Sequence, residues 1–234
     1  MKKKLCVAFV FAVLLGWSTI GAAVPLDVLV NGGSITVGDK LFSDWGYNLG
    51  FASGQTNVDL VGIDVIGMPS DPDNIGLLFV AVPDSISLVG PGNLNFEIYF
   101  TVTVQGSDLI KDNSLNIWGW QFSELQFPSA AAIEINEHVV DPTTDQLLGE
   151  KYVYVVGDGT QVLMDSATFS PVSSIDVVKT FNIYNEGAGN VALIEFTQHF
   201  SQEPGTPPAV PEPATMFLLG IGLLGIAVIG RRNS

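Results

Sequence analysis

The stretch NFEIYFTVTV, residues 95–104, alternates between polar and apolar side chains along its whole length. Phe96, Ile98, Phe100 and Val102 share one side of an extended chain, and the residues between them are polar or amphipathic. Successive side chains of a β-strand point to opposite faces, so this period of two predicts a strand with one buried face.

The same period recurs at AIEINEHV (132–139), SIDVVKTFNIY (174–184) and NVALIEFTQHF (190–200). In the first of these, Glu137 stands on the same side as the isoleucines. Clusters of Gly, Pro, Asn and Asp separate the runs, as expected for tight turns. With about ten to twelve candidate strands and no long segment of helical period, the sequence predicts an all-β antiparallel β-sandwich over residues 24–202. A division into two smaller sheets near Thr143 is the alternative.

The first 23 residues have the pattern of a secretory signal peptide. Three lysines precede an apolar run, and small residues follow, which predicts a signal helix, export through the Sec translocon and cleavage after Ala23. The one cysteine, Cys6, would leave with this peptide, so the mature chain would hold no thiol.

The last 24 residues, 211–234, combine three features. They begin with Pro211, Glu212 and Pro213, continue with an uncharged apolar run, and end near Arg231 and Arg232. The apolar run is long enough for a short transmembrane helix, and the arginines would remain on the cytoplasmic side. Residues 203–210 predict a Pro-rich linker. A permanent tail anchor is the plain alternative.

This tail resembles the PEP-CTERM sorting signal of Gram-negative bacteria. The resemblance implies that an exosortase recognises the chain at the inner membrane, where the tail anchors it transiently. The enzyme would remove the helix near the Pro-Glu-Pro box and pass the protein to the cell surface or extracellular matrix. Such proteins accompany exopolysaccharide and biofilm formation.

The middle of the chain is similar to a recurrent group of exported PEP-CTERM proteins. The similar segments are VGDKLFSDWGYN (37–48), GID, GLLF and DVVKTFNIYNEG (176–187), followed by NVALIEFTQHFSQ before the sorting box. This β-rich group has no known activity, so the resemblance implies export but no chemistry.

Acidic residues dominate the middle of the chain. The 234 residues carry a net charge of −15, and residues 24–203 hold 23 acidic residues against four lysines, a net charge of −19. Such a surface cannot neutralise phosphates, which excludes nucleic acid as a partner.

The tryptophans are the candidates for sugar stacking. Trp118 and Trp120 are two residues apart and would share one face of a strand, and Trp45 precedes Tyr47 by the same spacing. Exposed aromatic rings at these positions would bind exopolysaccharide, whereas buried rings would fill the core.

Asp71, Asp73 and Asn74 form an oxygen-rich loop, which makes Ca²⁺ the one cofactor to test. Ordinary turn chemistry explains the same residues, and no other cofactor is predicted. No nucleophile motif is present, and His138 and His199 fit sheet positions better than general bases. Three functions follow in order: a non-enzymatic exported surface protein, a carbohydrate-binding module, and a hydrolase using an unrecognised carboxylate pair.

Overall fold

The computed structural model describes residues 22–69, 74–124 and 130–205. Within these ranges the chain is all-β and antiparallel, with one helical turn, α1 (Leu26–Val30), and one 3₁₀ turn, η1 (Leu60–Gly62). The strands are β1 (Val24–Pro25), β2 (Ile35–Val37), β3 (Lys40–Val58), β4 (Ile63–Met68), β5 (Asn74–Ala81), β6 (Ile86–Val104), β7 (Leu109–Ser123), β8 (Ala131–Asp141), β9 (Gln146–Val156), β10 (Gln161–Val162), β11 (Met164–Val172), β12 (Ser174–Asn185) and β13 (Asn190–Glu203). The predicted fold class, all-β and antiparallel, is confirmed.

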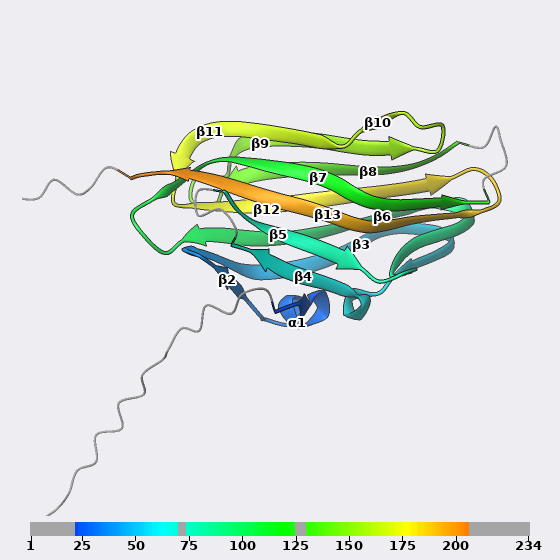
Figure 1. The fold of residues 1–234 in the computed structure, drawn as a ribbon, viewed down its shortest axis with the longest axis horizontal. Coiled ribbons are helices and arrows are strands. Elements are labelled where there is room, and N and C mark those ends of the chain that lie inside the picture. The colour runs from blue at the N-terminus through cyan, green and yellow to red at the C-terminus, as the bar shows by residue number, and fades with distance from the viewer. Residues whose placement is uncertain (1–21, 70–73, 125–129, 206–234) are drawn as a thin grey trace, which may run out of the picture. The chain divides into compact units, whose positions relative to one another are not determined.

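The strands form two hydrogen-bonded groups (Figure 1). The first layer has the order β2-β3-β6-β12-β8-β9-β10, and the second has the order β1-β4-β5-β13-β7-β11. A short pairing of β13 with the start of β6 joins the two layers. Strands β8 and β9, on either side of Thr143, pair with each other in one layer, so the chain does not divide into two sheets there.

Aromatic side chains from the two layers meet in a single core. Phe181 of β12 lies 5.3 Å from Phe196 of β13, and Trp45 of β3 lies 6.2 Å from Phe79 of β5 (ring centroids). Within the first layer, Phe96 and Phe181 stack at 4.5 Å. This two-layer packing is consistent with the predicted β-sandwich.

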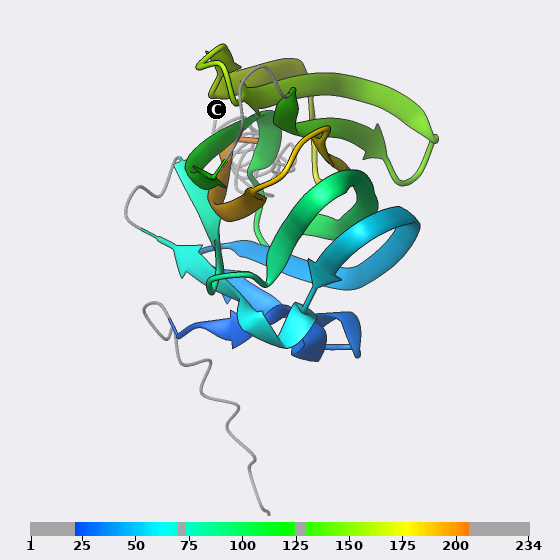
Figure 2. The same ribbon diagram turned by 90° about the vertical axis from the view of Figure 1, so that its right-hand side faces the viewer.

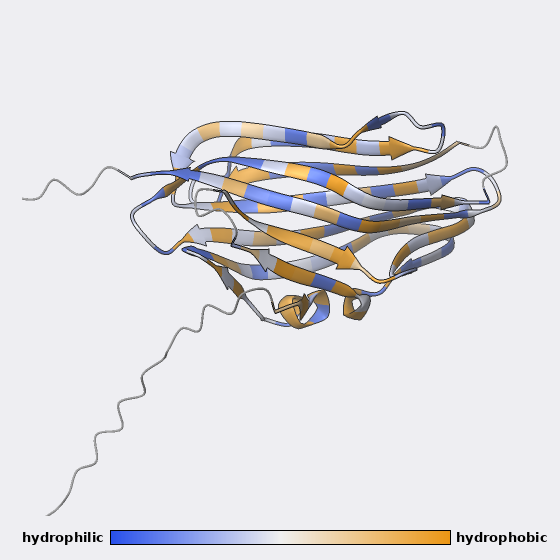
Figure 3. Ribbon diagram, viewed as in Figure 1, coloured by the Kyte–Doolittle hydropathy of each residue, from blue (hydrophilic) through white to orange (hydrophobic). Residues whose placement is uncertain are grey.

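The alternation seen in the sequence is retained in the strands. Along β12, every second residue from Ile175 to Ile183 is buried, and Figure 3 shows the resulting stripes of hydrophobic and hydrophilic residues. Lys179 occupies one of these buried positions. The period of two therefore identifies the buried face of the strand correctly, although one residue on that face, Lys179, is charged.

Paired strands β3 and β6 bend together at one end of the two-layer domain (Figure 2). The bend contains a register shift between Ser53 and Gln55, next to Gly54, which has a φ of +82°. A Cβ at Gly92 on β6 would stand 2.2 Å from the carbonyl oxygen of Ser53. Glycine is required there because the two backbones approach too closely for a side chain.

Several predictions concern the ends of the chain. The predicted signal helix lies almost wholly in residues 1–21, and the predicted transmembrane helix lies in residues 206–234, both outside the described ranges. No helix among the residues that the structure does describe has the length and apolar character needed to cross a membrane. Ala23 is exposed and directly precedes β1, and signal cleavage there stays a prediction.

Candidate functional site

The three tryptophans predicted to stack on sugars lie in different environments. Trp45 is 6% exposed, stacks on Phe100 at 4.5 Å, and donates a hydrogen bond from Nε1 to the Phe42 carbonyl oxygen at 3.1 Å. It is therefore part of the core, and the stacking hypothesis is wrong for this residue. Trp118 is 66% exposed, whereas Trp120 is partly buried and packs against the core.

Trp118 and Trp120 do not share a face, contrary to the prediction from their spacing. The pairing of β7 with β13 changes register between Leu193 and Phe196 of β13. Leu193 on one side of this irregularity and Ile117 of β7 on the other side both face the core. On β13, the residues that face the core have odd numbers before this bulge and even numbers after it. On β7, the numbering of the core-facing residues switches at the same place. An extra residue in a strand reverses which side chains face inward, so a spacing of two no longer means a common face.

Aromatic and polar side chains that could bind a sugar lie together on the outer surface of β8 and β9. Tyr152 and Tyr154 point outward from β9, with ring centroids 5.3 Å apart, and Tyr152 is 41% exposed. Directly across on β8 lie Asn136 and Glu134, whose side chains alternate with the buried isoleucines. Burial raises the pKa of Tyr152 to about 12, and the charge of Glu134 and its hydrogen bond add to the rise.

A shallow depression of about 300 Å³ lies beside Tyr152. It is lined by Asn136, His138, Glu150, Lys151, Tyr152 and Asp165. Asp165 of β11 accepts a hydrogen bond from the Tyr152 backbone N–H at 3.0 Å, and His138 Nε2 lies 3.2 Å from Glu150. We call this depression with Tyr152 and Tyr154 the tyrosine face.

The tyrosine face combines flat rings with amide and carboxylate groups. Aromatic rings offer apolar area to the C–H face of a sugar, and the neighbouring polar groups can bond its hydroxyls. These residues were not predicted as a sugar site, because the prediction was confined to the tryptophans. The segment KYVYVV, residues 151–156, already placed both tyrosines on one side of a strand.

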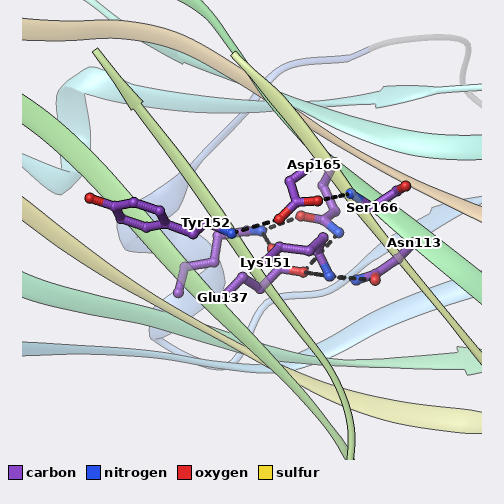
Figure 4. Close-up of polar contacts among 8 residues, drawn as sticks. Asn113, Glu137, Lys151, Tyr152, Asp165 and Ser166 are labelled. Atoms are coloured by element: carbon purple, nitrogen blue, oxygen red, sulfur yellow. Dashed lines mark hydrogen bonds and ion pairs between the residues drawn. The ribbon is translucent and has the colours of Figure 1, made fainter. Parts of the chain in front are cut away.

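A second group of polar side chains lies buried between the layers (Figure 4). Glu137 stands in the middle of the first layer, directly across from Lys151 on β9 and from Lys179 on β12. Asn113 and Gln198 approach from the second layer. All five residues are at most 3% exposed, and we call them the buried polar cluster.

The carboxylate of Glu137 is the centre of this cluster. Its Oε1 accepts from Lys151 Nζ at 2.7 Å, Asn113 Nδ2 at 2.8 Å and Gln198 Nε2 at 3.1 Å, and Oε2 accepts from Lys179 Nζ. Lys151 Nζ also donates to Asn113 Oδ1, and Lys179 Nζ donates to Gln198 Oε1. Every polar group of the cluster thus has a partner, as burial requires.

Electrostatics in the cluster favour a charged glutamate. Burial alone would raise the pKa of Glu137, but the charges of Lys179 and Lys151 and their hydrogen bonds outweigh it and lower the pKa. Burial lowers the pKa of Lys179 to about 8, although Glu137 works in the opposite direction. The sequence had placed Glu137 among inward positions, which was the available signal for this cluster.

The remaining predicted site residues lie mostly outside the described ranges. Asp71, Asp73, Pro211, Glu212, Pro213, Arg231 and Arg232 belong to that group, and Asn74 begins β5. Among the side chains that the structure describes, no three His, Cys, Asp or Glu residues gather as a metal site would require. The calcium prediction at Asp71, Asp73 and Asn74 therefore stays a prediction.

Fold and surface together define an all-β antiparallel domain with a polar, tyrosine-bearing outer face. In a comparison with protein families, residues 209–232 match the PEP-CTERM protein-sorting motif. The chain carries this sorting motif, which is consistent with an exosortase substrate and indicates export toward the cell surface with a membrane-anchored C-terminal signal.

Comparisons with curated proteins and with solved structures do not assign the chain to a family. No curated protein matches the sequence. The solved structure of TmCBM61 in complex with β-1,4-galactotriose is similar at 14% identity and a TM-score of 0.31, over 69% of this chain and 89% of that one. Arabinose-bound MgGH51 α-L-arabinofuranosidase gives 17% identity and a TM-score of 0.21, over 66% of this chain and 23% of that one. These TM-scores are too low to establish a common fold, and the sugars belong to those proteins alone.

Proposed function

We propose that this protein is an exported, non-enzymatic component of the cell surface or extracellular matrix, processed by an exosortase and associated with exopolysaccharide and biofilm. The observation that carries the proposal is the PEP-CTERM motif at residues 209–232. The Sec translocon delivers the chain, the inner membrane holds its tail transiently, and cleavage near the Pro-Glu-Pro box releases the acidic domain outward. Nucleic acid is not among its partners.

Terminal peptides of the extracellular protein test this processing. Mass spectrometry should find a mature chain that begins at Val24 and lacks Arg231 and Arg232. A double substitution, Pro211→Ala with Glu212→Ala, should leave the protein in the membrane fraction with its arginines attached. Extracellular wild-type protein that retains Arg231 would contradict the proposal.

A second candidate function, binding of exopolysaccharide, is supported by the tyrosine face. Tyr152 and Tyr154 offer neighbouring rings, and Tyr152 also lines a polar depression, an arrangement that suits a sugar chain lying across β8 and β9. The third alternative, a hydrolase, would need a pair of carboxyl groups about 5–10 Å apart around a cleft.

Affinity electrophoresis in gels that contain the host polysaccharide distinguishes these functions. Binding at the tyrosine face predicts retardation of the wild-type domain and its loss in Tyr152→Ala and Tyr154→Ala. Trp118→Ala is the matched control, because it removes an exposed aromatic residue from the other layer. Retardation that survives both tyrosine substitutions would exclude this face. Shortening of the polymer during incubation would instead support the hydrolase.

A further inference from the structure

The buried polar cluster contains an amine, a carboxamide and a carboxylate in mutual contact. Lys151 Nζ donates to the carboxamide oxygen of Asn113, and Glu137 Oε1 lies 2.7 Å from Lys151 Nζ and 2.8 Å from Asn113 Nδ2. One carboxylate oxygen therefore touches both the nitrogen that could attack Asn113 and the nitrogen that could leave it. The three residues come from different strands, β9, β7 and β8, and the first two strands belong to opposite layers.

From this geometry we propose that Lys151 and Asn113 join in an intramolecular amide cross-link, formed by the folded protein itself with Glu137 as its catalytic residue. Glu137 takes a proton from the Lys151 ammonium, and the resulting amine attacks Asn113 Cγ, so that an Nζ–Cγ bond forms and the Cγ–Nδ2 bond breaks. Glu137 passes this proton, and the second proton that Nζ loses, to Nδ2, which leaves as an ammonium ion. The carboxylate is regenerated, and the reaction needs no oxidant or other reactant.

Charge balance in the cluster favours this reaction. Lys151 and Lys179 share the single carboxylate of Glu137, and both ammonium groups are fully buried. A buried charge without its own partner is costly, and conversion of Lys151 to a neutral amide leaves one lysine paired with one glutamate. Lys179 stays next to Glu137 and 5.9 Å from the centre of the Phe100 ring.

Position in the core supplies the other conditions for the reaction. Packing holds the reacting groups together, which replaces an encounter in solution with contact in a fixed geometry. The apolar side chains Val153 and Ile135 flank the cluster along the same strands and keep water away from the amide that forms. The cluster thus favours the amide over its hydrolysis.

The cross-link would tie β7 to β9 across the two layers. Its ends are 38 residues apart in the chain, so it would close a long loop and stabilise the folded state against unfolding, as a disulfide does. The sole cysteine, Cys6, lies in the predicted signal peptide. An amide offers the exported domain a covalent tie that reducing agents do not open.

Peptide mapping of the full chain, purified from the cells that export it, tests the proposal. Trypsin cuts after unmodified lysine, so an unlinked chain yields peptides 112–151 and 152–179. The cross-linked chain should instead yield one peptide, 112–179, uncut at Lys151 and lighter than its sequence by about 17 Da, the mass of one ammonia. Tandem mass spectrometry should locate the link between Asn113 and Lys151.

Substitutions identify the role of each group. Asn113→Ala should restore the cut after Lys151 and the full peptide masses, and Glu137→Ala should also prevent the link. Asn136→Ala is the control, because this carboxamide is on the outer surface of β8 and the link should persist. The peptide map of the wild-type protein tests the cross-link by itself, even where a core variant fails to fold. Full-mass peptides 112–151 and 152–179 from wild type, or a link from Lys179 to Gln198, would overturn the proposal.

Discussion

Lys179 differs from the other residues of its strand because a charged group occupies a position that the alternation assigns to the core. Burial lowers the pKa of its ammonium from 10.5 to about 8. Between these two pH values the unfolded chain holds a proton that the folded chain has released. The free energy of unfolding therefore rises with pH across this interval, and the gain is lost as pH falls through about 8.

This titration predicts a pH dependence that Lys179→Met should remove. The denaturant midpoint of the wild type should increase from about pH 7.5 to about pH 9.5 more than that of the variant does. Tyr152, with a pKa raised to about 12, affects stability only at higher pH, since its contribution is lost as pH rises above 10. Equal slopes for the two proteins in urea titrations would contradict the assignment.

Trp118 leads to a second prediction at this scale. Of the three tryptophans after the predicted signal, Trp118 alone is largely exposed, whereas Trp45 is buried and Trp120 packs against the core. Acrylamide should therefore quench one component of the fluorescence efficiently, and Trp118→Phe should remove that component. Trp45→Phe serves as the control and should leave it in place. Efficient quenching that persists without Trp118 would show that another ring is open to solvent.

Single strands were predictable to the extent that one rule, the period of two, governs them. It predicted the strands at residues 95–104 and 174–184 and even the inward position of Glu137, because a strand's side chains alternate whatever their chemistry. It could not predict the bulge near Gly119, since a register shift arises from pairing between β7 and β13, which are far apart in sequence. For the same reason the sequence did not predict the side-chain contact between Lys151 and Asn113.

The close pairing of β3 and β6 gives a prediction at the scale of these two elements. A Cβ at Gly92 would meet the Ser53 backbone, which cannot rotate away as a side chain can. Gly92→Ala should therefore destabilise the protein by about 1–3 kcal/mol, measured by urea unfolding. Gly106→Ala is the matched control, because a Cβ at that position has no neighbour within 4 Å. A Gly92→Ala protein as stable as the control would mean that the strands separate there at little cost.

For the molecule as a whole, charge and core act in opposite directions. Residues 24–203 carry a net charge of −19, so acidic groups on the surface repel one another and oppose compaction. The core formed by the two layers must offset this repulsion without disulfides. Added salt screens exposed charges with a Debye length of about 10 Å at 0.1 M, so sodium chloride should raise the melting temperature of the exported protein.

A comparison of calcium with sodium distinguishes a specific metal site from this general screening of charge. If Asp71, Asp73 and Asn74 bind Ca²⁺, calcium chloride should raise the melting temperature further than sodium chloride at equal ionic strength. A ligand at 10 to 100 times its dissociation constant stabilises the folded state by about 1.4–2.7 kcal/mol. The double variant Asp71→Asn with Asp73→Asn should keep the response to sodium chloride and lose only the extra calcium effect. Identical melting curves in the two salts would remove calcium from this loop and leave its acidic residues to ordinary turn formation.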